Sequence, residues 1–390
     1  MRLTAIQQHG EGLGAAEVAE YRGARTAARF GDPQAELAAL RDCAVYDLGY
    51  RAKIALTGAD RVRWLNGMIT NNIRDLAAGD GVYGFLLNPQ GHILGDLYAY
   101  NRGQSITVDT DLSQIEGILA VFDHYIIMDD VEVTRLCPPD QGVPGSSGQA
   151  ATDAPSAREV TALGIGGPKA REVMRKAKME IPDLRPLELR EIQCDCECGC
   201  VKCTVVRTDK GIESYEIWLA PQQARPLWNA LVTAGASPIG SEALELHRIV
   251  SGIPRYGVDI RERDLPQETE QARALNFNKG CYIGQEIVER IRSRGAVHRK
   301  FSGFLAEGGG EAIAPAARIV AGEKEVGEIT SAATIRAGRG DKMVALGYIR
   351  REIGTPGREV LIGGVRARVI PLPVPDDLLA QENSLARHSA

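Results

Sequence analysis

One cysteine of this chain lies in a sequence context that suits a reactive thiol. Cys281 follows Gly280, and the apolar residues after a second glycine repeat at helical spacing from about Gln285. A helix N-terminus and nearby cations, here Lys279 and several arginines downstream, favour a thiolate over a thiol. Local chemistry leaves a second interpretation open, a buried and inert cysteine, because free cysteine also packs as a small hydrophobe.

A second group of thiols is notable for its density. It consists of Cys194, Cys196, Cys198, Cys200 and Cys203. The first four alternate with other residues, so a single extended strand would place them on one face. Three or four such thiolates could hold zinc, Cu(I) or an iron–sulfur cluster, although the spacing differs from the paired Cys-x2-Cys of common zinc sites. The alternative is a strand whose inward positions are cysteine.

The composition bounds the class of protein. The chain has 390 residues, of which 44% are hydrophobic, 25% charged and 5% aromatic, which is typical of a globular protein with two or three structural units. No apolar run approaches the roughly 20 residues that cross a bilayer, and the N-terminus has no apolar signal region. We therefore expect no membrane contact and a cytoplasmic location, where the eight cysteines are thiols or ligands.

The net charge of −5 argues against a general nucleic-acid-binding surface, but one short stretch is basic. The basic cluster consists of Arg290, Arg292, Arg294, His298, Arg299 and Lys300. It would suit a polyglutamyl tail, a phosphate backbone or an acidic partner, and a solvated surface is the alternative. An RNA-binding module is the weaker hypothesis, because the aromatic content is low and no stacking platform is evident.

Several elements can be predicted from apolar periodicity. Residues 52–57 alternate as a strand does, and 81–87 with 93–100 flank an Asn-Pro-Gln-Gly turn and predict a hairpin. The first forty residues look polar and helical. Short apolar runs broken by glycines after residue 296 predict a small β-barrel.

The cysteine motif resembles that of a known family. Lys279-Gly-Cys-Tyr-Ile-Gly-Gln-Glu286, followed by Arg294-Gly295, is similar to the signature of the YgfZ-type folate-binding proteins, relatives of the glycine-cleavage T protein, an aminomethyltransferase. Further segments that resemble the family extend from about residue 35 to 373. The motif residues that we expect to matter are Lys279, Gly280, Cys281, Tyr282, Gly284, Gln285 and Glu286.

The resemblance implies an α+β, tri-lobed aminomethyltransferase-like fold that binds folate and is closed by a C-terminal β-barrel. We expect a polar N-terminal extension over residues 1–34, a folate-binding region over 35–295, the barrel over 296–373 and a flexible tail over 374–390. The folate-binding region would comprise two interleaved α+β lobes and a mobile loop at about 137–157.

Three residues outside the cysteine motif match functional positions of the family. Glu216 matches the carboxylate that holds the pterin ring, and a carboxylate can accept two parallel N–H bonds from an aminopterin edge. Arg248 matches the arginine at the anionic end of folate. The alternatives are an exposed strand glutamate and a surface salt bridge. Asp96 matches one of two adjacent aspartates near the folate in the glycine-cleavage enzymes; here the pair reads Gly95-Asp96, so general acid–base assistance would rest on a single carboxylate.

The resemblance implies a tetrahydrofolate-binding auxiliary factor for iron–sulfur cluster assembly or repair, with Cys281 as the reactive thiol or a transient cluster ligand. Its partners would be folate and iron–sulfur assembly or client proteins. Transfer RNA would be involved only indirectly, through tRNA-modifying enzymes among those clients. The alternative is an enzyme in the strict sense, a tetrahydrofolate-dependent aminomethyltransferase, and the sequence leaves this choice open.

Overall fold

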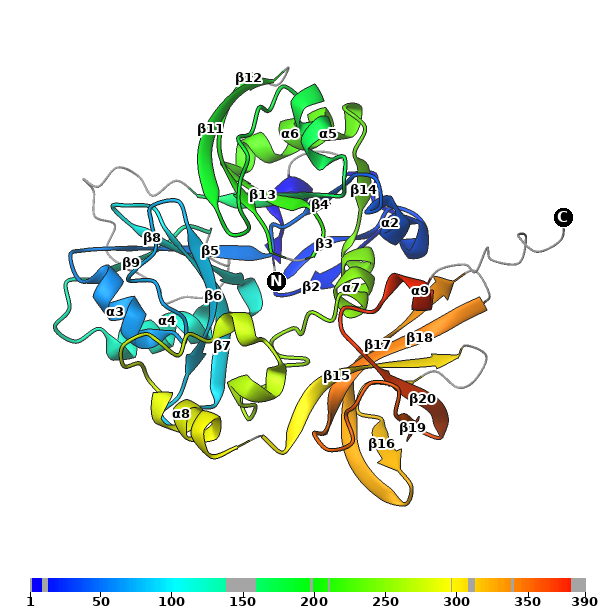
Figure 1. Ribbon diagram of the computed structural model, residues 1–390. Helices are drawn as coiled ribbons and strands as arrows, with labels where there is room; N and C mark the ends of the chain where they lie inside the picture. Colours follow the sequence, from blue (N-terminus) through cyan, green and yellow to red (C-terminus); the bar gives the residue numbers. More distant parts are fainter. Residues whose placement is uncertain are drawn as a thin grey trace, which may run out of the picture. The chain divides into compact units, whose positions relative to one another are not determined.

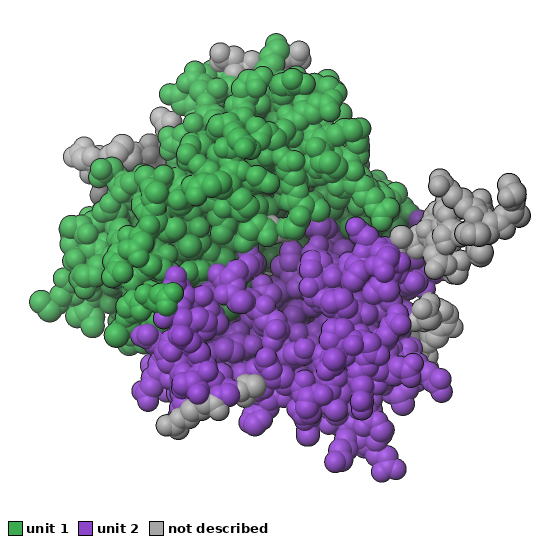
Figure 2. All heavy atoms as spheres, in the orientation of Figure 1, with its two compact units in different colours: residues 1–86, 95–244, 278–282 green, residues 87–94, 245–277, 283–390 purple. Residues whose placement is uncertain are grey.

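The backbone of the computed structural model forms two compact units (Figure 2). Unit 1 comprises residues 1–86, 95–244 and 278–282, and unit 2 comprises residues 87–94, 245–277 and 283–390. The structure describes residues 2–8, 13–137, 159–196, 199–209, 211–295, 297–307, 313–337 and 340–379. The predicted loop at about 137–157 therefore lies outside the described residues except for its first residue, as does most of the predicted tail.

The N-terminal segment of unit 1 is a small sheet with two short helices. Its three strands have the order β1-β3-β2, and α1 and α2 follow β1 and β3 along the chain. The prediction of helices is wrong for β2 and β3, because Arg22 (φ 52°) and Gly23 (φ 93°) both adopt the left-handed region and close a tight hairpin turn between these strands. The bounds are β1 Arg2–Leu3, α1 Ala5–Gln8, β2 Glu17–Tyr21, β3 Ala24–Arg29 and α2 Pro33–Ala39.

A six-stranded sheet of unit 1 has the order β11-β12-β13-β10-β4-β14 (Figure 1). Apolar residues of α5 and α6 share one buried core with residues of β4, β10, β12 and β13, so these helices cover a face of the sheet. The bounds are β4 Ala44–Asp47, β10 Thr161–Gly166, α5 Ala170–Lys176, β11 Leu189–Cys196, β12 Gly199–Arg207, β13 Ser214–Leu219, α6 Pro221–Thr233 and β14 Ser237–Ile239.

A five-stranded sheet has the order β6-β7-β8-β5-β9. The strand predicted at 52–57 and both arms of the predicted hairpin are confirmed as β5, β6 and β7. Trp64 of α3 packs edge-on against Phe122 of α4, with ring centroids 5.1 Å apart. The bounds are β5 Arg51–Thr57, α3 Arg61–Met68, β6 Gly81–Leu87, β7 Ile93–Asn101, β8 Ile106–Asp111, the 3-10 helix η1 Leu112–Gln114, α4 Ile115–Tyr125 and β9 Glu132–Arg135.

Unit 2 contains the predicted barrel, which is confirmed as a closed six-stranded barrel of order β15-β18-β17-β16-β19-β20 with an apolar interior (Figure 1). The predicted helix after the cysteine motif is confirmed as α8. Within the described part of the chain, no helix is long and apolar enough to cross a membrane. The bounds are α7 Ser241–Val250, which begins in unit 1, η2 Pro266–Thr269, η3 Ala272–Ala274, α8 Gln285–Arg294, β15 Arg299–Glu307, β16 Arg318–Ala321, β17 Lys324–Ala337, β18 Gly340–Arg350, β19 Glu359–Ile362, β20 Val365–Ile370 and α9 Asp376–Leu379.

Candidate functional site

Two adjacent strands of unit 1 carry opposite charges on one face. The register of β5 and β8 pairs Arg51 with Asp111 and Lys53 with Asp109, and the two-residue period of a strand brings all four side chains to the same side. Arg51 donates hydrogen bonds to Asp109 at 2.7 Å and to Asp111 at 2.6 Å, and Lys53 Nζ donates to Asp109 at 2.6 Å. All four residues are buried. Cross-strand pairs of opposite charge therefore form a buried ladder, which we call the charge ladder.

The charge ladder predicts a specific acid sensitivity. Burial alone would raise the pKa of Asp111, but Arg22 and Arg51 outweigh it and hold that pKa at about 2, below the ordinary value of 3.8. A lowered folded-state pKa stabilises the fold above pH 4, and this contribution is lost as the pH falls toward 2. At about 1.4 kcal/mol per pKa unit, the full contribution is about 2 kcal/mol.

Denaturant unfolding between pH 5 and pH 3 measures this contribution. We expect the parent chain to lose about 1 kcal/mol more of its free energy of unfolding over this interval than Asp111→Asn loses. Equal losses in the two proteins would contradict the assignment of a low pKa to Asp111.

Glu216 lies at the end of the charge ladder. On β13 it alternates with Ile217, so its side chain shares a face with Trp218, and only 4% of the residue is exposed. Trp218 Nε1 donates to Glu216 Oε2 at 3.2 Å, and Lys53 Nζ lies 4.0 Å from the same oxygen. The ammonium of Lys53 also lies over the Trp218 ring, 4.8 Å from its centroid. This burial excludes the interpretation of Glu216 as an exposed strand residue.

A row of aromatic rings runs from Trp218 along the five-stranded sheet. Trp218 contacts Tyr100 edge-on with centroids 5.2 Å apart, Tyr100 stacks on Tyr98 at 6.4 Å, and Tyr98 meets Tyr83 at 4.9 Å. The Tyr83 hydroxyl donates to Asp96 at 2.7 Å. We call these four rings the aromatic row. It connects Glu216 at one end with Asp96 at the other through successive ring contacts within unit 1.

Asp96 is held in a fixed orientation by uncharged donors. Besides Tyr83, Gln114 Nε2 donates to its carboxylate at 2.7 Å, and Gln114 Oε1 accepts from the Asp96 backbone N–H at 3.0 Å. Burial raises the pKa of Asp96, and the nearby Asp111 raises it further, while the bonds from Tyr83 and Gln114 act in the opposite direction. A carboxyl group with a raised pKa and a locked orientation is suited to exchanging a proton with a bound molecule.

The thiol of Cys281 is exposed, which excludes the interpretation as a buried, inert cysteine. Gly280 beside it is also exposed, whereas Lys279 and Tyr282 on either side of this pair are buried. The ammonium of Lys279 donates to three backbone carbonyls, those of Asn66, Ile69 and Asn71. Its N–H groups are thus directed at the end of α3 and not at the thiol.

The remaining motif residues lie at the start of α8 in unit 2. Gly284 is the N-cap with φ 79°, and a Cβ there would come within 2.6 Å of the Asn88 carbonyl oxygen, so this position requires glycine. Gln285 and Glu286 occupy the first turn of α8, where an acidic side chain is favourable.

Arg248 lies in unit 2, within a buried cluster. Its guanidinium donates to Asp259 at 2.5 Å and to Ser331 Oγ at 2.7 Å, and it also pairs with Glu245. Thr330 completes the cluster by donating to Asp259 at 2.5 Å. Arg248 thus forms a buried salt bridge, not a surface one, and its role at the anionic end of folate remains a prediction.

The cysteine run does not form one strand. Cys194 lies on β11 opposite Val201, and the chain reverses between Cys196 and Gly199 to form the hairpin with β12, so the prediction of a single cysteine-bearing face is wrong. Cys194 and Cys203 are buried in the core of the six-stranded sheet, whereas Cys200 is exposed. Cys198 lies outside the described residues. Among the residues that the structure describes, no group of three His, Cys, Asp or Glu side chains could hold a metal.

Part of the basic cluster is neutralised within unit 2. Arg299 pairs with Asp264 at 2.6 Å and with Glu268 at 2.9 Å, and Arg292 lies 3.4 Å from Glu289. The surface available to a polyanion is therefore smaller than the sequence indicates.

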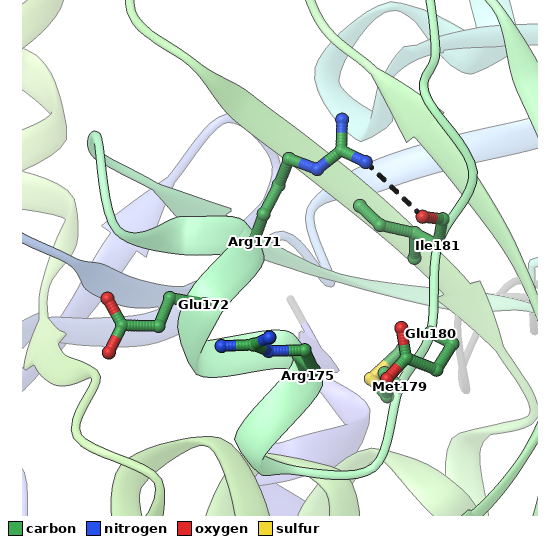
Figure 3. Close-up of a pocket in the computed structure, with 6 residues that line it drawn as sticks. All are labelled: Arg171, Glu172, Arg175, Met179, Glu180 and Ile181. Carbon is green, nitrogen blue, oxygen red and sulfur yellow. Dashed lines mark hydrogen bonds between the residues drawn. The ribbon is translucent and has the colours of Figure 1, made fainter.

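A hollow of about 300 Å³ lies beside α5 (Figure 3). Figure 3 shows Arg171 donating to the Ile181 carbonyl, a bond of 3.4 Å. The hollow is lined by Arg171, Glu172, Arg175, Met179, Glu180 and Ile181. None of the functional residues predicted from the sequence is among them.

The fold is similar to that of a known structure. The chain matches the crystal structure of the glycine cleavage system aminomethyltransferase T from Bartonella henselae with a TM-score of 0.80, over 96% of this chain and 98% of that chain, at 20% sequence identity. The predicted α+β fold of the aminomethyltransferase type is thereby confirmed.

Sequence comparison gives the family. Residues 9–279 match the GCVT N-terminal domain family, and the chain belongs to this family. It is 28% identical to an aminomethyltransferase of Rubrobacter xylanophilus over 96% of this chain and 94% of the relative. It is also 25% identical to an aminomethyltransferase of Caldanaerobacter subterraneus, over 76% of this chain and 75% of that protein. The predicted relationship to the glycine-cleavage T protein is thereby confirmed as membership of this family.

Sequence reasoning missed the charge ladder and the aromatic row. A signal for the ladder was present, because charged residues alternate in Arg51-Ala-Lys53 and in Asp109-Thr-Asp111, the spacing of side chains on one face of a strand. The aromatic row had a similar signal in Tyr98-Ala-Tyr100. Which strands would lie beside each other was not evident from the sequence, so neither signal indicated a site.

Proposed function

We propose that this chain binds tetrahydrofolate in unit 1 and serves as an auxiliary factor for iron–sulfur cluster assembly or repair, with Cys281 as its reactive thiol. The observation that carries the folate part is the buried carboxylate of Glu216 at the end of the aromatic row. The observation that supports the thiol part is the exposure of Cys281 between two buried residues. A location in the cytoplasm and iron–sulfur client proteins, including tRNA-modifying enzymes, belong to the same proposal.

The residues of unit 1 fit a pterin. Glu216 could accept two N–H bonds from the aminopterin edge, and a ring of the aromatic row would pack against the flat heterocycle held there. A buried donor also remains for such a ligand, since Arg51 Nε has no hydrogen-bond partner among the described residues. Asp96, held by Tyr83 and Gln114, would lie near the reactive nitrogens and move a proton there.

The iron–sulfur cluster would be the substrate on which Cys281 acts. As a thiolate it can bond to one iron in place of another thiolate ligand, but a cluster needs about four protein ligands, so a partner protein or a small thiol must supply the others. A strain that lacks this protein should therefore lose activity of iron–sulfur enzymes, and the parent chain should restore it. Normal activity of those enzymes in the deletion strain would remove the support for this role.

The second candidate is a tetrahydrofolate-dependent aminomethyltransferase, which the similarity to the Rubrobacter and Caldanaerobacter enzymes favours. If it is correct, mixing the protein with a carrier bearing an aminomethyl-lipoyl group and with tetrahydrofolate will yield methylene-tetrahydrofolate, ammonia and the reduced lipoyl thiol. Asp96→Asn should then lower kcat by about 100-fold, the usual scale of general acid–base assistance, with little change in folate affinity. If the proposed auxiliary role is correct, the parent chain will form no methylene-tetrahydrofolate above the protein-free rate.

A further inference from the structure

We infer that Lys279 is a positioning residue, which anchors the Cys281 segment to the end of α3 by hydrogen-bond geometry and not by charge. The inference rests on the proposed role of Cys281. The ammonium lies 2.5 Å from the Asn66 carbonyl oxygen and 2.7 Å from those of Ile69 and Asn71. An ammonium has three N–H groups, so each carbonyl receives one of them. We call these three oxygens the carbonyl cup.

Burying the Lys279 ammonium costs free energy unless its hydrogen bonds compensate for the lost hydration. Lys279 is 7% exposed and has no carboxylate partner among the described residues. Burial lowers its pKa to about 7, and the nearby Arg74 acts in the same direction. The carbonyl dipoles at the C-terminal end of α3 oppose this by favouring a cation. A methionine would fill similar space at less desolvation cost, so lysine at this position indicates that the three directed bonds are needed.

The anchor determines how Cys281 is displayed. Lys279 and Tyr282 are both buried, and the ammonium lies 5.0 Å from the centroid of the Tyr282 ring. The two residues between them, Gly280 and Cys281, are exposed. A short segment with a buried residue at each end has few conformations, so the thiol is presented at a defined place on unit 1.

The same anchor is linked to Asp96 through consecutive hydrogen bonds. Asn71, whose carbonyl belongs to the carbonyl cup, donates from Nδ2 to the Tyr83 carbonyl at 2.8 Å, and the Tyr83 hydroxyl donates to Asp96. Thr70 fastens the intervening segment to β6, since its N–H donates to Phe85 O at 3.0 Å. Lys279 therefore fixes the Cys281 segment to the element that orients Asp96.

Two variants separate geometry from charge. Lys279→Met removes the three N–H donors, whereas Lys279→Arg keeps the charge in a planar group that cannot direct three N–H bonds at three convergent carbonyls. In both we expect thermolysin to cleave between Tyr282 and Ile283 at least 10-fold faster than in the parent chain, because the unanchored segment opens more often. Cleavage is followed by mass spectrometry, with Lys176→Met as the matched control at an exposed lysine, for which the parent rate is expected.

The second measurement is of Cys281-dependent activity and tetrahydrofolate affinity. We expect both Lys279 variants to lose Cys281-dependent activity by at least 10-fold while the tetrahydrofolate Kd stays within about twofold of the parent value. If Lys279→Met fails to fold by circular dichroism, Lys279→Arg alone decides. Parent-like cleavage, or activity restored by arginine, would overturn the inference. If Cys281→Ser itself proves active, the proposed function fails, yet the cleavage rates still test the anchor independently.

Discussion

Tetrahydrofolate should bind Glu216→Ala at least about 100-fold more weakly than it binds the parent chain. The substitution removes the carboxylate that would accept two N–H bonds from the pterin edge. Charge-assisted hydrogen bonds contribute about 1.5–3 kcal/mol each, and about 1.4 kcal/mol corresponds to a tenfold change in Kd. Isothermal titration calorimetry with tetrahydrofolate under anaerobic conditions measures the change.

The control for this experiment is Glu191→Gln. Glu191 lies on β11 of the same sheet, but its side chain is 73% exposed, and its ion pair with Arg102 contributes little. We expect Glu191→Gln to bind tetrahydrofolate as tightly as the parent chain does. A parent-like Kd for Glu216→Ala would mean that the pterin is not held by this carboxylate. Glu216→Ala should still fold, because Lys53 keeps Asp109 as its ion-pair partner. Circular dichroism checks this.

Cys281→Ser should abolish the activity of iron–sulfur clients in a complementation assay while leaving the tetrahydrofolate Kd within about twofold of the parent value. Serine is nearly isosteric, but its hydroxyl stays protonated at neutral pH and is a poor ligand for iron, whereas a thiolate is the usual one. The exposure of Cys281 means that the substitution removes no core packing, so the free energy of unfolding should change by less than about 0.5 kcal/mol.

Cys43→Ala is the matched control for the loss of a thiol. Cys43 is buried in the core of the six-stranded sheet and belongs neither to the motif nor to the cysteine run. We expect this variant to support full complementation despite a modest loss of stability. Retained activity in Cys281→Ser would refute the role of the thiol, and loss in both variants would point to an effect of stability.

The sequence predicted those parts of the fold that local patterns determine. The alternation at 52–57, the turn between β6 and β7 and the short strands of the barrel each carry their signal within a few residues. The hairpin β2–β3 escaped prediction because its turn begins with Arg22, which is uncommon in the left-handed region. The reversal within the cysteine run also escaped prediction, because the cysteines continue to alternate along the sequence where the chain reverses.

The candidate site was predicted only where single residues match the family motif. Glu216, Asp96 and Cys281 were predicted in this way, but the surroundings of each depend on which strands lie side by side. The contact of Lys53 with Glu216 joins β5 to β13, and neither strand specifies the other in sequence. Lys279 shows the same limit: its charge suggested activation of the thiol, whereas its three N–H bonds are directed to carbonyls more than 200 positions earlier in the chain.

A crystal structure of the chain with tetrahydrofolate tests the central claim most directly. We expect density for the pterin in unit 1, with its amino edge within about 3 Å of both Glu216 carboxylate oxygens and its ring against the aromatic row. A pterin bound elsewhere, with Glu216 still engaged only by Trp218 and Lys53, would contradict the account.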